Sequence, residues 1–138
     1  MTQTNKYRAY FSVSGDFDPA EITALLGMAP SDSWKKGDVS PKTRLERKCG
    51  RWSLYSRLTG ASSLEEQIAD VIQRLEPHVE AISDLGTKFE TVMQLVGYFH
   101  SYYPGFALDQ ETIVKLARLR LGIDCDFYYL YSDEREDS

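Results

Sequence analysis

Asp124 and Asp126 are the residues whose types and spacing come nearest to acid–base chemistry in this sequence. Alternate residues of a strand share one face and lie about 7 Å apart, so the two carboxylates could act as a general acid and a general base. Solvated or arginine-paired carboxylates at a sheet edge have the same geometry. Arg8 and Arg57 are candidate partners on that face, and we expect pairing or solvation rather than catalysis.

The histidines and cysteines offer little for catalysis or metal binding. His78 and His100 lie 22 positions apart, and neither has a neighbour at the spacing of metal ligands. Cys49 and Cys125, 76 positions apart, are expected to be reduced thiols in or near the core. Neither Gly-x-Gly-x-x-Gly nor the P-loop pattern occurs. We therefore expect no catalytic residue, no bound metal and no cofactor.

Trp34, Lys35 and Lys36 are the candidate binding residues of the long polar segment 30–48. An aromatic ring beside two cations and a glycine offers a stacking surface, positive charge and a backbone amide that an anion can approach. Alternatively, Trp34 packs against the body of the protein and pins the loop. The two interpretations are compatible if the lysines point outward.

Charge is unevenly distributed along the chain, although the net charge is only −5. The first 60 residues carry 10 basic and 6 acidic groups, and the remaining 78 carry 6 basic and 15 acidic groups. If the basic segment is an anion or partner site, its side chains should converge on one patch. The residues concerned are Lys35, Lys36, Lys42, Arg44, Arg47 and Lys48. Otherwise the segment is a solvated loop and edge strand kept soluble by lysine.

Apolar alternation predicts strands over 6–14, 51–57, 88–100 and 123–131. The third is apolar on both sides along part of its length, which is typical of a central strand. An edge strand could lie near the end of the polar segment 30–48. Residues 133–138 form a charged tail without apolar side chains, which we expect to fray.

Capping signals and apolar stripes predict the helices. Asp18 and Pro19 start a short helix that Gly27 ends. A stripe predicts a second helix over 63–75, interrupted by Pro77, and a further helical piece over 78–85 stopped by Gly86. Asp109 caps a last helix that Gly122 terminates. Its stripe is Ile113, Leu116, Ala117 and Arg120.

These elements predict an α+β fold, with a mixed or antiparallel sheet, helices mainly on one face and an approximately ferredoxin-like arrangement. We expect one domain over 1–138. The predicted core consists of Phe11, Trp52, Leu54, Ile68, Ile72, Met93, Leu95, Leu116 and Phe127.

The strand phases also predict a tyrosine-rich sheet face opposite the core. Its members are Arg8, Tyr10, Ser12, Ser53, Tyr55, Arg57, Val96, Tyr98, Asp124, Asp126 and Tyr128. Tyrosine supplies flat apolar area with a polar edge and suits recognition. This face is predicted to be a ligand groove or a self-association surface. The alternative is that the helical insert 63–85 covers it and turns it into a second core.

Several segments resemble a family of small bacterial proteins known as a domain of unknown function (DUF4279). They are Asp18-Pro19-Ala20-Glu21-Ile22-Thr23, Leu26-Gly27-Met28-Ala29-Pro30, Trp34-Lys35-Lys36-Gly37-Asp38, Trp52-Ser53-Leu54 and 121–128. The resemblance covers nearly the whole chain. It implies a bacterial, single-domain, stand-alone protein and implies no activity.

The sequence favours a non-catalytic binding or interaction protein of the bacterial cytosol, of the kind that neutralises a partner as toxin-immunity proteins do. The amino terminus is polar, and no run approaches the roughly 18 apolar residues of a membrane helix. The alternative is a small-molecule sensor or enzyme that uses the tyrosine-rich face. A pI near 5.0 opposes nucleic-acid binding. The expected partner is a protein or a small molecule, and a homodimer is an open alternative.

Overall fold

The computed structural model describes residues 3–103 and 105–131, so the predicted tail at 133–138 lies outside the described residues. The elements follow in the order β1 (Lys6–Gly15), α1 (Pro19–Leu26), β2 (Asp32–Trp34), β3 (Gly50–Tyr55), α2 (Leu64–Leu75), a 3-10 turn (Glu76–His78), α3 (Val79–Lys88), β4 (Glu90–Phe99), α4 (Gln110–Arg118) and β5 (Gly122–Tyr129). The α+β class is confirmed. In residues 3–103 and 105–131 no helix combines the length and apolarity needed to cross a membrane.

The strands form one mixed sheet in the order β2-β3-β1-β4-β5. β1 is antiparallel to both β3 and β4, and β2 is antiparallel to β3. β4 and β5 are parallel, and α4 lies on the crossover that parallel pairing requires. β4 is an inner strand, as its two apolar sides indicated. With this strand order the resemblance to a ferredoxin-like fold is approximate.

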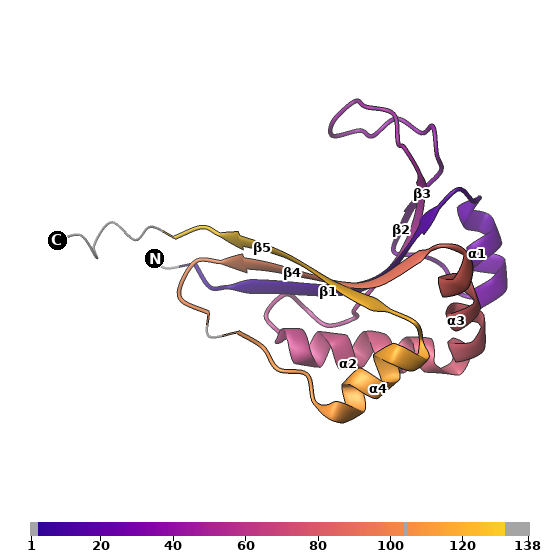
Figure 1. Cartoon of the computed structure of the whole chain (residues 1–138). Helices are drawn as coiled ribbons and strands as arrows, with labels where there is room; N and C mark the ends of the chain where they lie inside the picture. The colour runs from indigo at the N-terminus through magenta and orange to yellow at the C-terminus, as the bar shows by residue number, and fades with distance from the viewer. Residues whose placement is uncertain (1–2, 104, 132–138) are drawn as a thin grey trace.

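The helices cover one face of the sheet. Figure 1 shows α2 and α4 running beneath the long strands, with α1 and α3 at the end where the sheet curves upward. Their apolar side chains form one cluster with the inward residues of β1, β3 and β4. All predicted core residues are buried except Phe127, which packs against the cluster from the edge strand β5 and stays partly accessible.

The predicted start and end of α1 are confirmed. Asp18 accepts a hydrogen bond from the Ala20 amide, and Gly27 closes the helix at φ 66°. Pro77 interrupts the second helix only by a 3-10 turn, because a proline in a first turn has no amide that needs a partner. The helix then continues as α3 through Gly86, which is therefore not a stop.

The predicted stripe of α4 is wrong in part. Ile113 is 52% exposed, whereas Leu116 and Leu119 are buried. α4 ends at Arg118, and Arg120 adopts φ 60°. This tight turn directs Leu119 and Leu121 toward the core in place of the predicted Ala117 and Arg120, which are both exposed.

Two further differences concern sheet edges. The edge strand β2 lies at the start of the polar segment, and near its end there is only the isolated bridge between Val39 and Glu46. Cys125 is exposed rather than in or near the core, because β5 is an edge strand and the helices pack mainly against the other strands. Cys49 is partly buried.

Candidate functional site

The sheet face opposite the helices, called the open face below, is not covered by a helix in the described part of the chain. Backbone register places Tyr10 beside Tyr55, and Tyr98 beside Tyr128, on this face. Tyr10 and Tyr55 are partly buried, and Tyr128 is 43% exposed. The alternative that the insert 63–85 forms a second core here is wrong, because α2 and α3 pack into the core on the other face.

Two tyrosine pairs give the open face its shape. The ring centroids of Tyr10 and Tyr55 are 5.1 Å apart, and those of Tyr98 and Tyr128 are 5.4 Å apart and nearly parallel. The Arg8 guanidinium lies over the Tyr55 ring, 4.9 Å from its centroid. Such contacts between cross-strand neighbours hold the rings upright on the sheet. The open face therefore presents flat aromatic surfaces with hydroxyl groups at their edges.

Asp124 and Asp126 lie on the β5 side of the open face and are exposed. The Tyr128 hydroxyl donates a 2.7 Å hydrogen bond to Asp126 Oδ2, and this bond and the carboxylate charge raise the pKa of Tyr128. The proposed pairing with arginine is not formed: within the described residues, no carboxylate lies within 4.0 Å of the Arg8 guanidinium.

Tyr10 lies at the centre of the open face, where several charges act on its hydroxyl. Burial raises the pKa of Tyr10, the charge of Arg51 lowers it, and Tyr55, Arg8 and Asp126 have smaller effects of both signs. The strand register gives the same grouping: Tyr10 pairs with Tyr55, whose ring lies under Arg8, and Val96 of β4 lies between Arg8 and Asp126. Arg8, Tyr10 and Tyr55 thus lie together on the open face, with Asp126 two strands from Arg8.

The loop of residues 35–49 stands above one end of the open face and creates a groove. Figure 1 shows this loop projecting from the end of β2 and returning to β3. The groove has a volume of about 600 Å³. Tyr10, Ser53 and Tyr55 line it from the sheet, while Lys42 and Arg47 line it from the loop.

Backbone hydrogen bonds hold the two arms of the 35–49 loop together. Gly37 donates to the Arg47 carbonyl at 2.9 Å, and the Arg47 amide donates to the Asp38 carbonyl at 2.7 Å. The Ser40 amide donates to the Leu45 carbonyl at 2.9 Å. The loop is therefore an irregular hairpin, so its side chains have defined positions over the sheet.

Trp34 connects the 35–49 loop to the sheet. The Arg47 guanidinium lies 3.7 Å from the centroid of the Trp34 ring, and that of Arg51 lies 5.3 Å away. Lys35 and Lys36 turn away from the groove toward Asp18 and Asp16, with N–O distances of 3.4 and 3.9 Å. Trp34 is partly buried and also lines the groove, so its ring contacts the loop through Arg47 while the two lysines point outward.

The basic segment divides into two groups. Arg47 and Lys42 line the groove together with Arg51, whereas Lys35 and Lys36 face α1. Arg44 and Lys48 are exposed and do not line the groove. The predicted convergence on one patch holds for only part of the segment.

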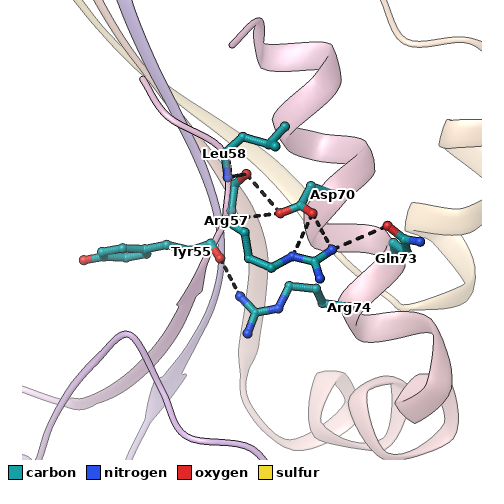
Figure 2. A network of polar contacts seen from close by, with 7 residues as sticks. Tyr55, Arg57, Leu58, Asp70, Gln73 and Arg74 are labelled. Atoms are coloured by element: carbon teal, nitrogen blue, oxygen red, sulfur yellow. Dashed lines mark hydrogen bonds and ion pairs between the residues drawn. The ribbon is translucent and has the colours of Figure 1, made fainter. Parts of the chain in front are cut away.

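Arg57 was predicted to share the open face, but it lies on the helical side. Its Nε donates to Asp70 Oδ1 at 3.0 Å and its amide donates to Asp70 Oδ2 at 2.7 Å. Figure 2 shows Arg57 and Asp70 on one side of the strand, with the Tyr55 ring pointing away on the other. The reason is that β3 ends at Tyr55, so the alternation predicted over 51–57 does not reach Arg57.

Arg51 belongs to the groove, although the prediction did not include it among the site residues. The alternation that places Ser53 and Tyr55 on the open face applies equally to Arg51, so the signal was present in the sequence. Arg51 also faces Trp34 across the β2–β3 ladder. Its Nε donates to Ser14 Oγ at 3.2 Å.

Among residues 3–103 and 105–131, no group of three or more His, Cys, Asp or Glu side chains is placed to hold a metal ion. The candidate binding features of the described residues are therefore the two tyrosine pairs and the groove with its arginines.

Comparison with known proteins gives a family and no function. A family model described as a domain of unknown function, DUF4279, matches residues 5–130. No curated protein and no solved structure matches the chain.

Proposed function

The chain belongs to the DUF4279 family, whose description assigns no function, and we propose that it is a non-catalytic binding protein of the bacterial cytosol whose ligand occupies the groove. One observation carries this proposal. The helices pack on one face of the sheet and leave Tyr10 and Tyr55 as an accessible wall beneath the 35–49 loop.

The composition of the groove supports recognition rather than simple solvation. Tyrosine side chains have few rotatable bonds, so covering them with a ligand costs little side-chain entropy. Ser12 and Ser53 are the next pair along the same face, and both are small and buried. Ser53 lines the groove beside the two tyrosine rings, where its small side chain leaves space that a ligand can fill.

The size of the groove fits a small molecule. Ligand pockets in proteins typically have volumes of about 300 to 1,000 Å³, and the groove has about 600 Å³. A sensor that reports a small molecule would use the same groove. An enzyme would in addition need a reacting group, for which the hydrogen-bonded Asp126 and Tyr128 are the nearest candidates.

Screening a library of aromatic fragments by amide NMR spectra tests the proposal. Fragments that bind should shift the amides of Tyr10, Ser53 and Tyr55, and a Tyr10→Ala/Tyr55→Ala variant should lose the response. Tyr102→Ala is the matched control, because Tyr102 is an exposed tyrosine outside the groove. Hits that map to the helical side, or a screen in which no fragment shifts these amides, would contradict the proposal.

A protein partner is the second candidate, because the 35–49 loop exposes apolar side chains. Val39 is 63% exposed and Leu45 is 69% exposed, and both lie on the arms of the loop. Exposed apolar groups at a projecting loop are typical contact points for another protein. An immunity-like role would place a toxin against this loop.

The immunity-like role has its own test. If a toxin gene lies beside the gene for this chain, the purified toxin should form a complex with the protein. Leu45→Asp should weaken that complex, whereas Leu25→Asp should not, since Leu25 is exposed on α1. A complex insensitive to Leu45→Asp would mean that the loop is not the contact surface.

A further inference from the structure

Two arginines lie over one tryptophan ring at the groove. Trp34 on β2 faces Arg51 across the ladder, and Arg47 reaches the same ring from the returning arm of the 35–49 loop. Stacking on an aromatic face fixes the plane of a guanidinium group and limits its rotamers. The two cations are therefore held near each other before any ligand binds.

The charges of these arginines are not neutralised by ion pairs within the described residues. No carboxylate oxygen lies within 4.0 Å of either guanidinium, although the outer cations Lys35 and Lys36 both have carboxylate partners. Lys42 adds a third positive charge to the groove. Like charges held close together repel each other, and an anion between them would relieve that repulsion.

The carboxylates of the groove limit what can bind. Asp38 lines the groove, but its Oδ2 accepts a hydrogen bond from the Lys35 amide at 2.9 Å. Asp32 lies on the open face opposite Ser53 and also lines the groove. The lining thus has three cations against two carboxylates, which favours an anion while opposing a molecule of high negative charge.

From this arrangement we infer that Arg47, Arg51 and Trp34 form an oxyanion site, and that the ligand of the groove is a phosphorylated small molecule with a flat ring. The inference rests on the proposed function of the groove and names the class of its ligand. Guanidinium groups present paired donors that match the oxygens of a phosphate. The Tyr10 and Tyr55 rings, on the sheet wall of the same groove, supply the surface on which a flat ring can lie.

Three matched probes test this inference by NMR titration: phenyl phosphate, inorganic phosphate and phenol. Phenyl phosphate should bind more tightly than either of its halves. Arg47→Gln and Arg51→Gln should each weaken the binding of phenyl phosphate about tenfold and weaken the binding of phenol less than that. Lys35→Gln is the control, because this cation of the same segment pairs with Asp18 outside the groove.

Asp32→Asn removes a negative charge from the groove and should therefore strengthen the binding of phenyl phosphate. Misfolding can only weaken binding, so a gain of affinity in this variant must come from the change in charge. The inference is overturned if phenol binds as tightly as phenyl phosphate, if the arginine variants bind like the wild type, or if neither phosphate probe shifts the groove amides. In each of these cases aromatic fragments that still map to Tyr10 and Tyr55 would leave the proposed function standing. Failure of the fragment screen itself would remove both.

Discussion

Gln67 and Asp70 are polar residues of α2 that are buried against the sheet. The Gln67 side chain accepts from the Ala9 amide at 2.9 Å and donates to the Tyr7 carbonyl at 2.8 Å. It thereby pairs with β1 where β3 has already ended at Tyr55. The Ala9 amide and the Tyr7 carbonyl would otherwise be buried without hydrogen-bond partners, and the Gln67 side chain supplies both.

Asp70 holds the chain where it leaves β3 for α2. Its carboxylate accepts hydrogen bonds from the Ser56 hydroxyl and from the amide and side chain of Arg57 (Figure 2). Arg74, on the same helix, donates to the Tyr55 carbonyl at 2.9 Å. The open face can present Tyr55 because these contacts fix the strand end from behind.

We expect Asp70→Asn to lower the free energy of unfolding by about 1 to 2 kcal/mol, because it weakens hydrogen bonds that are partly screened by solvent at Arg57. Urea denaturation at neutral pH measures the change. Asp84→Asn is the control, because Asp84 is exposed and its carboxylate contacts no described partner. Equal stability of the two variants would show that the Asp70 contacts contribute nothing.

The Asp70 contribution should depend on pH. Burial acts to raise the pKa of this carboxyl, but hydrogen bonds from Arg57 and Ser56 outweigh it, so the pKa falls below its ordinary value of 3.8. A group with a lowered folded pKa stabilises the protein fully above its unfolded pKa, and this stabilisation is lost as the pH falls through the folded value. The difference between wild type and Asp70→Asn should therefore persist at neutral pH and shrink below about pH 4.

At the scale of single residues, the sequence predicts side-chain phase better than it predicts where a strand ends. Tyr10 and Tyr55 follow from alternation alone. Arg57 was misplaced because nothing in the alternation marks the end of β3 after Tyr55, which depends on contacts with Asp70, 13 residues away in the chain. A contact of this kind has no local signature.

Among the elements, those with strong local signals were predicted and short ones were missed. α1 has an N-cap, a proline at its first position and a left-handed glycine at its end, all of which act within the helix itself. β2 has three residues, too few for a periodic pattern. The stripe of α4 was assigned wrongly because its last buried leucines lie in the turn that follows the helix.

β4 depends on Gly97, where Phe99 folds back over the strand. A Cβ at Gly97 would overlap the Phe99 ring, which itself packs against Tyr103 and Phe127. We expect Gly97→Ala to lower the free energy of unfolding by about 1 to 3 kcal/mol, because the ring cannot move without disturbing its neighbours. Denaturation in urea provides the measurement.

Gly122 on β5 offers a matched control for Gly97. The nearest atom to a Cβ there is a side-chain carbon of Val92 at 3.9 Å, which is ordinary contact. Gly122→Ala should therefore be neutral or slightly stabilising, since alanine reduces the freedom of the unfolded chain. If both alanine variants lost the same stability, the close approach of Phe99 would not be the cause of the Gly97 effect.

At the scale of the whole molecule, the sheet divides the protein into a packed side and an open side. Alternation in β1 and β3 sends apolar residues to the helices and tyrosine, serine and arginine to the other face. The sequence predicts this division, because it follows from period-two patterns. The position of the 35–49 loop over the open face does not follow from such a pattern, since it depends on Trp34 meeting Arg47 and Arg51.

The outer edge of β5 is a place where a second copy of the chain could add to the sheet. Within the described residues β5 pairs only with β4, so its other edge has free backbone groups that could pair with another strand. In an antiparallel pair of two β5 strands with continuous open faces, registers centred on Asp124, Cys125 or Asp126 each place a carboxylate opposite another carboxylate. Like charges directly opposite destabilise strand pairing.

We therefore expect the protein to be monomeric at neutral pH, with Asp124 and Asp126 preventing edge-to-edge association. Replacing both by asparagine removes the repulsion in every one of these registers, so the Asp124→Asn/Asp126→Asn variant should form dimers or larger species in light scattering after size exclusion. Glu111→Asn/Asp84→Asn removes the same charge from exposed helical positions and should stay monomeric. A wild-type dimer that persists at neutral pH would show that another surface, or a register avoiding these carboxylates, joins the two copies.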